Sequence, residues 1–106
     1  MRFGTAQEKA FARDLVLELA KDLKPVLLAS RRQVLSVNKI TRQLEKTYQG
    51  VAAYQREHRP GFIRRAVLAN TFKWELKNAG YPDDFVEIAT EGLVVEMSKA
   101  TSDASK

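Results

Sequence analysis

The 106-residue chain contains no cysteine at all. Disulfide bonds and metal sites built from thiolates are therefore excluded. Long apolar runs are missing as well: the first residues lack the apolar stretch of a signal peptide, and no segment has the length needed to span a membrane. Together these absences predict a soluble, cytoplasmic protein that has no membrane partner.

Side chains that carry enzyme chemistry are scarce. The chain has a single histidine, His58, in a predicted loop. It has no serine in a G-x-S-x-G setting, no phosphate-binding loop and no G-x-G-x-x-G run. Asp84, Glu87 and Glu91 share one face of a predicted helix, but we interpret that face as solvated or matched to basic side chains, because the Glu-x-x-His pairs of di-metal bundles are missing. The sequence therefore predicts no enzyme, no cofactor and no metal.

Helix-breaking residues are also few, with three prolines and five glycines. Apolar residues between them recur at three- and four-residue steps, and no segment shows the two-residue alternation of a strand. The predicted fold class is all-α, a compact bundle of four to five helices with short loops. We expect helices over about 6–24, 26–35, 38–57, 62–79 and 82–99, in a single domain that spans 1–100, followed by a disordered tail over 101–106.

Two local patterns define helix ends. Thr5 and Glu8 have the spacing of a capping box, which predicts a helix that begins near residue 6. Gly80 is suited to the left-handed position just after a helix, where Tyr81 would contact Leu76 and Pro82 would prevent continuation. The expected core stripes are Phe11, Leu15, Val16, Leu19 and Leu23 in the first helix, and Val37, Ile40, Leu44, Tyr48 and Val51 in the third.

Basic residues are concentrated in the middle of the chain. Residues 25–81 hold eleven Lys or Arg and three acids, whereas residues 82–106 hold two basic residues and six acidic ones. A concentrated basic surface attracts polyanions over a Debye length or more. Seven of the eleven are arginines, whose planar guanidinium groups suit phosphates and base edges.

The first functional hypothesis is therefore a small nucleic-acid-binding accessory or regulatory protein that contacts the phosphate backbone of DNA or RNA. The residues predicted to make these contacts are Arg31, Arg32, Lys39, Arg42, Lys46, Arg64 and Arg65. The competing interpretation is that acidic ridges of the same bundle neutralise much of this charge through weak surface pairs.

The helix over 62–79 has two apolar faces. One carries Phe62, Leu68, Ala69, Phe72 and Leu76, and the other carries Ile63, Val67 and Trp74. A surface helix needs only one apolar stripe. The second face indicates either a central helix packed on both sides, or a protein interface that serves a homodimer or an acidic protein partner. The second functional hypothesis is thus a protein-interaction module: an adaptor, an inhibitor or an assembly subunit.

The folded arrangement of the charges discriminates between these hypotheses. One continuous basic patch favours nucleic acid, whereas an open apolar face flanked by scattered charges favours a protein partner.

Overall fold

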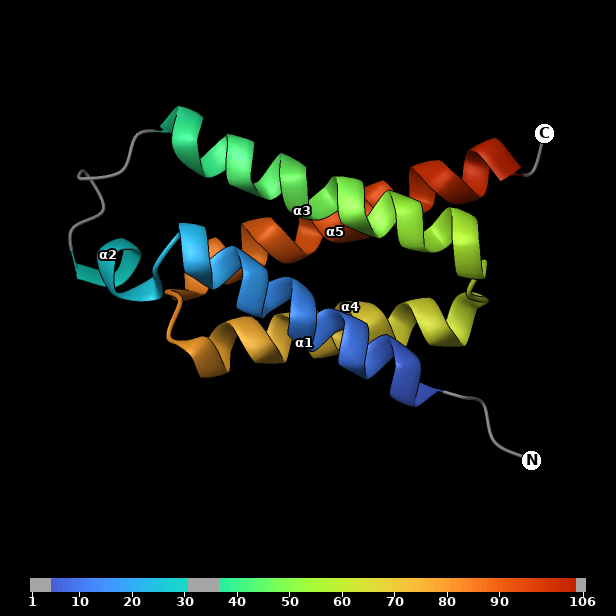
Figure 1. Ribbon diagram of the computed structural model, residues 1–106, viewed down its shortest axis with the longest axis horizontal. Coiled ribbons are helices and arrows are strands. Elements are labelled where there is room, and N and C mark those ends of the chain that lie inside the picture. The colour runs from blue at the N-terminus through green and yellow to red at the C-terminus, as the bar shows by residue number, and fades with distance from the viewer. Residues whose placement is uncertain (1–4, 31–36, 105–106) are drawn as a thin grey trace.

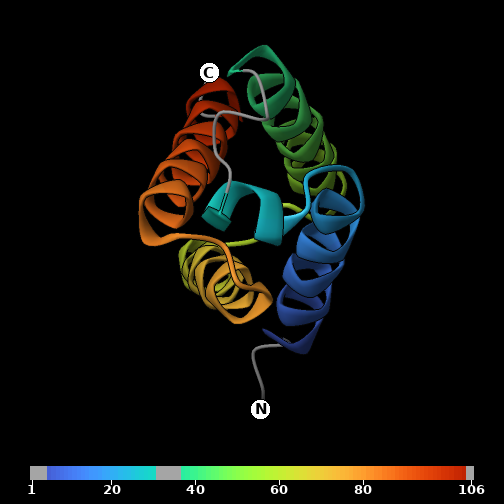
Figure 2. The ribbon, with the colours of Figure 1, turned by 90° about the vertical axis from the view of Figure 1, so that its left-hand side faces the viewer.

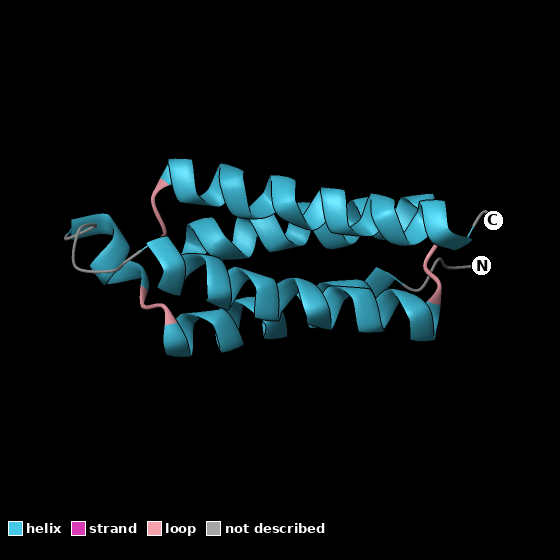
Figure 3. Cartoon of the chain, turned by 90° about the horizontal axis from the view of Figure 1, so that it is seen from above, coloured by secondary structure: helices cyan, strands magenta, loops and turns pink. Residues whose placement is uncertain are grey.

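The computed structural model describes residues 5–30 and 37–104, and no strand occurs within these ranges (Figure 3). Its helices are α1 (Thr5–Asp22), α2 (Pro25–Ser30), α3 (Val37–His58), α4 (Phe62–Ala79) and α5 (Asp83–Ala104) (Figure 1). The all-α bundle with short connections is confirmed, and α4 has the bounds expected from the sequence.

The four long helices stand at the corners of a bundle when seen end-on (Figure 2). Helix α1 packs most extensively against α4, α3 packs against α5, and the two pairs meet through α1 with α3 and α4 with α5. Helices α3 and α4, although consecutive in the chain, therefore occupy diagonal corners. As a result α1 and α4 run in the same direction, as do α3 and α5 (Figure 1).

The core lies between the four corners and is built from the predicted stripes. Val16, Leu19 and Leu23 of α1 are buried, as are Leu44 and Val51 of α3. From α4 and α5 the core takes Leu68, Phe72, Leu76, Phe85, Val86, Ala89, Leu93 and Met97. The short helix α2 lies across one end of the bundle, where Leu28 is buried (Figure 2).

The end of α4 has the predicted structure. Gly80 has a φ of 103°, its amide donates to the carbonyl of Lys77 at 3.1 Å, and the amide of Tyr81 donates to the carbonyl of Leu76 at 3.2 Å. This pair of bonds satisfies carbonyls that a helix end otherwise leaves without partners. The Tyr81 hydroxyl also donates to the carbonyl of Leu23, which ties the α4–α5 turn to the end of α1.

The α3–α4 connection is a tight turn that carries the chain across the bundle. Arg59 has a φ of 47°, which is uncommon for a residue with a side chain, and its amide donates to the carbonyl of Gln55 at 2.9 Å. Pro60 is buried, and Gly61 precedes the first turn of α4.

Three expectations need correction or fall outside the described residues. Helix α5 continues to Ala104 instead of ending near Lys99, because neither glycine nor proline interrupts it after Gly92. Phe62, expected on the core face of α4, is 78% exposed, because it lies in the first turn of the helix. The expected second helix over 26–35 is the shorter α2, and residues 31–36 lie outside the described part of the chain.

Candidate interaction surfaces

The outward face of α4 is open. Trp74 is 51% exposed and Ile63 is 54% exposed, while Val67 between them is partly buried. The opposite side of the same helix holds Phe72 and other fully buried core residues. The alternative of a central helix packed on both sides is therefore wrong for this face, and the three residues predicted as a protein interface share one surface.

Cations border this apolar face. The ammonium group of Lys77 lies 5.2 Å from the centroid of the Trp74 ring, and Lys73 stands one turn earlier and is partly buried. A cation over an indole ring is attracted by the ring quadrupole, which favours a fixed orientation of the Trp74 side chain. The face thus combines a large apolar side chain with positive charge.

Helix α5 presents a second outward face of opposite charge. Ile88 is 61% exposed and Val95 is 55% exposed. The carboxylates of Asp84, Glu87 and Glu91 are exposed on the same helix. In the described ranges, most of the exposed large hydrophobic side chains lie on α4 and α5: Phe62, Ile63, Trp74, Ile88, Val94 and Val95. The others in these ranges are Leu17 and Val26. Exposed apolar surface is therefore concentrated on two neighbouring helices.

The predicted nucleic-acid residues are not brought together. Lys39, Arg42 and Lys46 are exposed on the outward side of α3. Arg64 and Arg65 lie on α4, at the diagonal corner of the bundle, and are partly buried. Arg31 and Arg32 lie outside the described residues. The seven residues therefore do not form one patch within the part of the chain that the structure describes.

An acidic residue also borders the row of Lys39, Arg42 and Lys46 on α3. The ammonium of Lys46 lies 3.6 Å from a carboxylate oxygen of Asp22 on α1. Both side chains are largely exposed, so this ion pair contributes little to stability. It does reduce the positive charge that the middle of α3 offers to a polyanion.

Arg64 has an internal partner. Its Nη2 and Nε atoms donate to Oε2 of Glu8 at 2.8 and 3.0 Å, and the hydroxyl of Tyr54 donates to the same oxygen at 2.7 Å. Glu8 is fully buried, so this cluster joins the beginning of α1, the end of α3 and the beginning of α4. The guanidinium of Arg64 is largely committed to the fold.

The cluster also shifts proton affinities. Burial acts to raise the pKa of Glu8, but hydrogen bonds from Arg64 and Tyr54, together with the charge of Arg64, outweigh it and hold the pKa below 4.5. Burial and the hydrogen bond to Glu8 raise the pKa of Tyr54 to about 12. The carboxylate is thus charged and the phenol neutral at physiological pH.

The sequence pattern predicts only a capping role for Glu8, and this cluster is not predicted from it. The available signal was position, because Glu8 continues the buried series Ala12, Val16, Leu19 and Leu23 by one further turn. An acid in register with a core stripe predicts a buried partner on another helix. The identity of that partner could not be read from local sequence, since Arg64 is 56 positions away.

Aromatic rings extend the cluster to the molecular surface. The rings of Phe11 and Tyr54 stack with centroids 4.0 Å apart, and the Tyr54 ring lies 4.4 Å from the half-buried ring of His58. The amide nitrogen of Gln7 lies 3.0 Å from Nδ1 of His58. His58 therefore serves the packing of α1 on α3.

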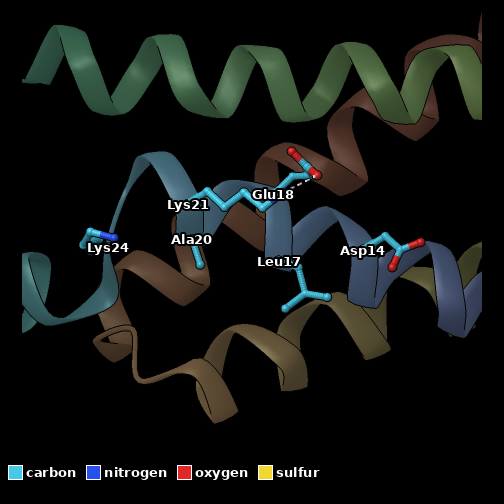
Figure 4. Close-up of a pocket in the computed structure, with 6 residues that line it drawn as sticks. All are labelled: Asp14, Leu17, Glu18, Ala20, Lys21 and Lys24. Atoms are coloured by element: carbon cyan, nitrogen blue, oxygen red, sulfur yellow. Dashed lines mark hydrogen bonds and ion pairs between the residues drawn. The ribbon is translucent and has the colours of Figure 1, made fainter.

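The surface of α1 carries an open depression (Figure 4). It is lined by Asp14, Leu17, Glu18, Ala20, Lys21 and Lys24, which all belong to α1 or follow it directly. Lys21 pairs with Glu18 at 3.3 Å within the depression. Because a single helix lines it, the depression does not enclose a ligand.

Among the described residues, no group of three or more His, Asp or Glu side chains is placed to hold a metal ion. In the same part of the chain, no helix is both long and apolar enough to cross a membrane. Comparisons with protein-family models, curated proteins and solved structures find no match.

Proposed function

We propose that this protein is a helical interaction module that binds another polypeptide through the outward face of α4. The observation that carries the proposal is the exposure of Ile63 and Trp74, each more than half accessible, on one face of a helix whose other face is core. Partly exposed tryptophan is enriched among the residues that dominate binding energy at protein interfaces. Exposed apolar patches on soluble proteins often mark such sites.

Charge indicates the chemistry of the partner. Apart from Arg64, which is paired with Glu8, helix α4 carries Arg65, Lys73 and Lys77 against the single acid Glu75. Like charges placed opposite each other across an interface are costly, whereas opposite charges increase the association rate and fix the register. An acidic amphipathic segment therefore complements this face.

Site-specific photo-crosslinking in the cell tests this function. A photoreactive residue at Asn70, which is exposed in the middle of the α4 face, is expected to give a discrete adduct with another polypeptide. The matched control places the same probe at Ala53, an exposed position on α3. Adducts that are equal at the two positions, or absent at Asn70, would contradict the proposal.

A second candidate function is nucleic-acid binding through α3, and it is favoured by the exposed row Lys39, Arg42 and Lys46. Binding of this kind should weaken steeply as salt rises, because phosphate contacts release counterions. Replacing the three residues with Glu should abolish it, while the same replacement of Lys9, Lys21 and Lys24 on or next to α1 serves as a charge-matched control. No association with DNA or RNA at low salt, or equal loss in both triple variants, would count against this function.

A further inference from the structure

The outward stripe of α4 follows steps of four and three residues. It consists of Ile63, Val67, Asn70, Trp74 and Lys77. All of these side chains are exposed except Val67, which is partly buried. Steps of four and three keep residues on one side of a helix, so the stripe can contact a single partner helix along its length.

The outward stripe of α5 follows the same steps. It consists of Asp84, Ile88, Glu91, Val95 and Ser98, all of which are exposed. The α5 stripe alternates polar with apolar side chains, whereas the α4 stripe has Ile63, Val67 and Trp74 interrupted by Asn70 and followed by Lys77. Both helices also contribute buried residues to the same core.

The two stripes are complementary when the helices run antiparallel. In that register the opposing pairs are Trp74 with Ile88, Val67 with Val95, Asn70 with Glu91, Lys77 with Asp84 and Ile63 with Ser98. Apolar side chains thus meet apolar ones in the centre, and an amide faces a carboxylate between them. Beside the stripes, at the edge of the contact, Lys73 lies opposite Glu87. This pair adds a second opposition of charges to that of Lys77 and Asp84.

Net charge favours the same pairing. Helix α4 has one acid and four basic residues, of which Arg64 is already paired with Glu8, whereas α5 has six acids and one lysine. Within one molecule these helices already pack side by side through other faces, so their outward stripes remain available for a second copy. A contact between α4 of one copy and α5 of another brings opposite charges together.

Pairing of like helices is less favourable. An antiparallel contact of α4 with another α4 that keeps Val67 opposite Trp74 places Asn70 opposite itself and Lys77 opposite Ile63, so Lys77 has no carboxylate partner. The corresponding contact of α5 with another α5 that keeps Ile88 opposite Val95 places Glu91 opposite itself. The α5 arrangement opposes like charges, which costs binding free energy, and the α4 arrangement brings together two helices of net positive charge without any opposing carboxylate in the stripe.

We propose that the outward face of α4 binds the outward face of α5 of a second copy of this chain, with the helices antiparallel. The inference rests on the proposed function of the α4 face and names its partner. Because the two surfaces differ, the contact is heterologous. A contact between two helices is smaller than the roughly 1,200 Å² at which standard stable interfaces begin, so association is expected to be weak and concentration-dependent.

Sedimentation of purified variants tests the pairing. Trp74→Asp disables the α4 face, Ile88→Asp disables the α5 face, and Val26→Asp on α2 changes an equally exposed apolar residue outside both stripes. The wild type and Val26→Asp are expected to associate as concentration rises, whereas each of the other variants alone remains monomeric. An equimolar mixture of Trp74→Asp and Ile88→Asp should form dimers, because one copy retains α4 and the other retains α5.

Charge reversal supplies an independent readout. One double variant carries Lys73→Glu and Lys77→Glu, and its α4 face should no longer bind the α5 face of the wild type. A second double variant carries Asp84→Lys and Glu87→Lys on α5. The α4 face of the first variant should bind the α5 face of the second, because the charges are again opposite. Circular dichroism confirms that each variant is folded before it is compared.

A wild type that stays monomeric at every concentration would overturn the self-pairing, as would full association of Ile88→Asp on its own. Neither of these results affects the crosslinking test at Asn70. An adduct between Asn70 and a different polypeptide would still support protein binding by the α4 face. Loss of both the self-association and the Asn70 adduct would overturn the two proposals together.

Discussion

The carboxylate of Glu8 and the guanidinium of Arg64 meet at 2.8 Å, although the two residues are 56 positions apart in the chain. Glu8 is fully buried, and Arg64 holds it from the first turn of α4. This contact fixes how the beginning of α4 is set against the beginning of α1. It thereby orients the α4 face that we propose as the docking surface.

Stability should fall in acid because of this contact. The pKa of Glu8 is lower in the folded state than its ordinary value of 4.5, so the folded protein retains the charged form over a pH range in which the unfolded chain binds a proton. The contribution of Glu8 is therefore complete above pH 4.5 and is lost as pH falls through the folded pKa. Urea unfolding from pH 7 to pH 3 should show a smaller acid-induced loss in Glu8→Gln than in wild type. Equal losses in the two proteins would show that Glu8 does not carry this effect.

Removal of Arg64 should be far more damaging than removal of an exposed arginine. Arg64→Leu leaves the Glu8 carboxylate buried with only the Tyr54 hydroxyl as a partner, and an uncompensated buried charge is strongly destabilising. The matched variant Arg42→Leu changes an exposed residue of α3, where substitutions usually alter stability by about 0.5 kcal/mol or less. Thermal unfolding monitored by circular dichroism should show a clearly lower midpoint for Arg64→Leu alone. Similar midpoints for both variants would contradict the role assigned to the pair.

The glycines at positions 92 and 50 should respond in opposite ways to alanine. A Cβ on Gly92 would overlap the Tyr48 ring, whose hydroxyl donates to the carbonyl of Ala89 at 2.8 Å. Gly92→Ala should therefore destabilise the fold by about 1–3 kcal/mol, as overpacking does elsewhere.

A Cβ on Gly50 would lie 3.7 Å from Leu15, an ordinary contact, so Gly50→Ala should stabilise α3 by about 0.5–1 kcal/mol. Chemical denaturation measures both changes, and a destabilising Gly50→Ala or a neutral Gly92→Ala would refute the packing described.

The end of α4 depends on the backbone conformation of Gly80. Its φ of 103° is unfavourable for any residue with a Cβ and most of all for a β-branched one. Gly80→Val should therefore cost about 1 kcal/mol or more in the free energy of unfolding. Gly61→Ala is the control, because Gly61 has an ordinary extended backbone and no atom within 4 Å of an added Cβ. Equal stability of the two variants would argue against the left-handed cap.

Sequence alone predicts the parts of this fold that depend on neighbouring residues. Pro60 and Gly61 before α4, and Gly80 to Pro82 after it, define its bounds because each acts on the local backbone. The core stripes follow from periodicity for the same reason. The predicted end of α5 near Lys99 is wrong because polar residues weaken a helix without stopping it.

The candidate sites were predictable only in part. The apolar stripe of Ile63, Val67 and Trp74 is a property of one helix, and its three residues do share a face. The residues predicted to bind nucleic acid come from several helices, so whether they lie close together depends on which corners of the bundle those helices occupy. The diagonal placement of α3 and α4 is set by packing over the whole bundle, so no local pattern revealed that Lys39 and Arg65 lie on different corners.

The fluorescence of Trp74 tests the pairing of α4 with α5 most directly, because the chain has a single tryptophan and it lies at the centre of the proposed contact. In the dilute wild type the emission should be that of a half-exposed indole. As concentration rises, the emission should shift to shorter wavelength, because Ile88 of a second copy removes water from the Trp74 ring, and Ile88→Asp should show no such shift. An emission maximum that stays constant at every concentration of the wild type, or shifts equally in Ile88→Asp, would contradict the pairing.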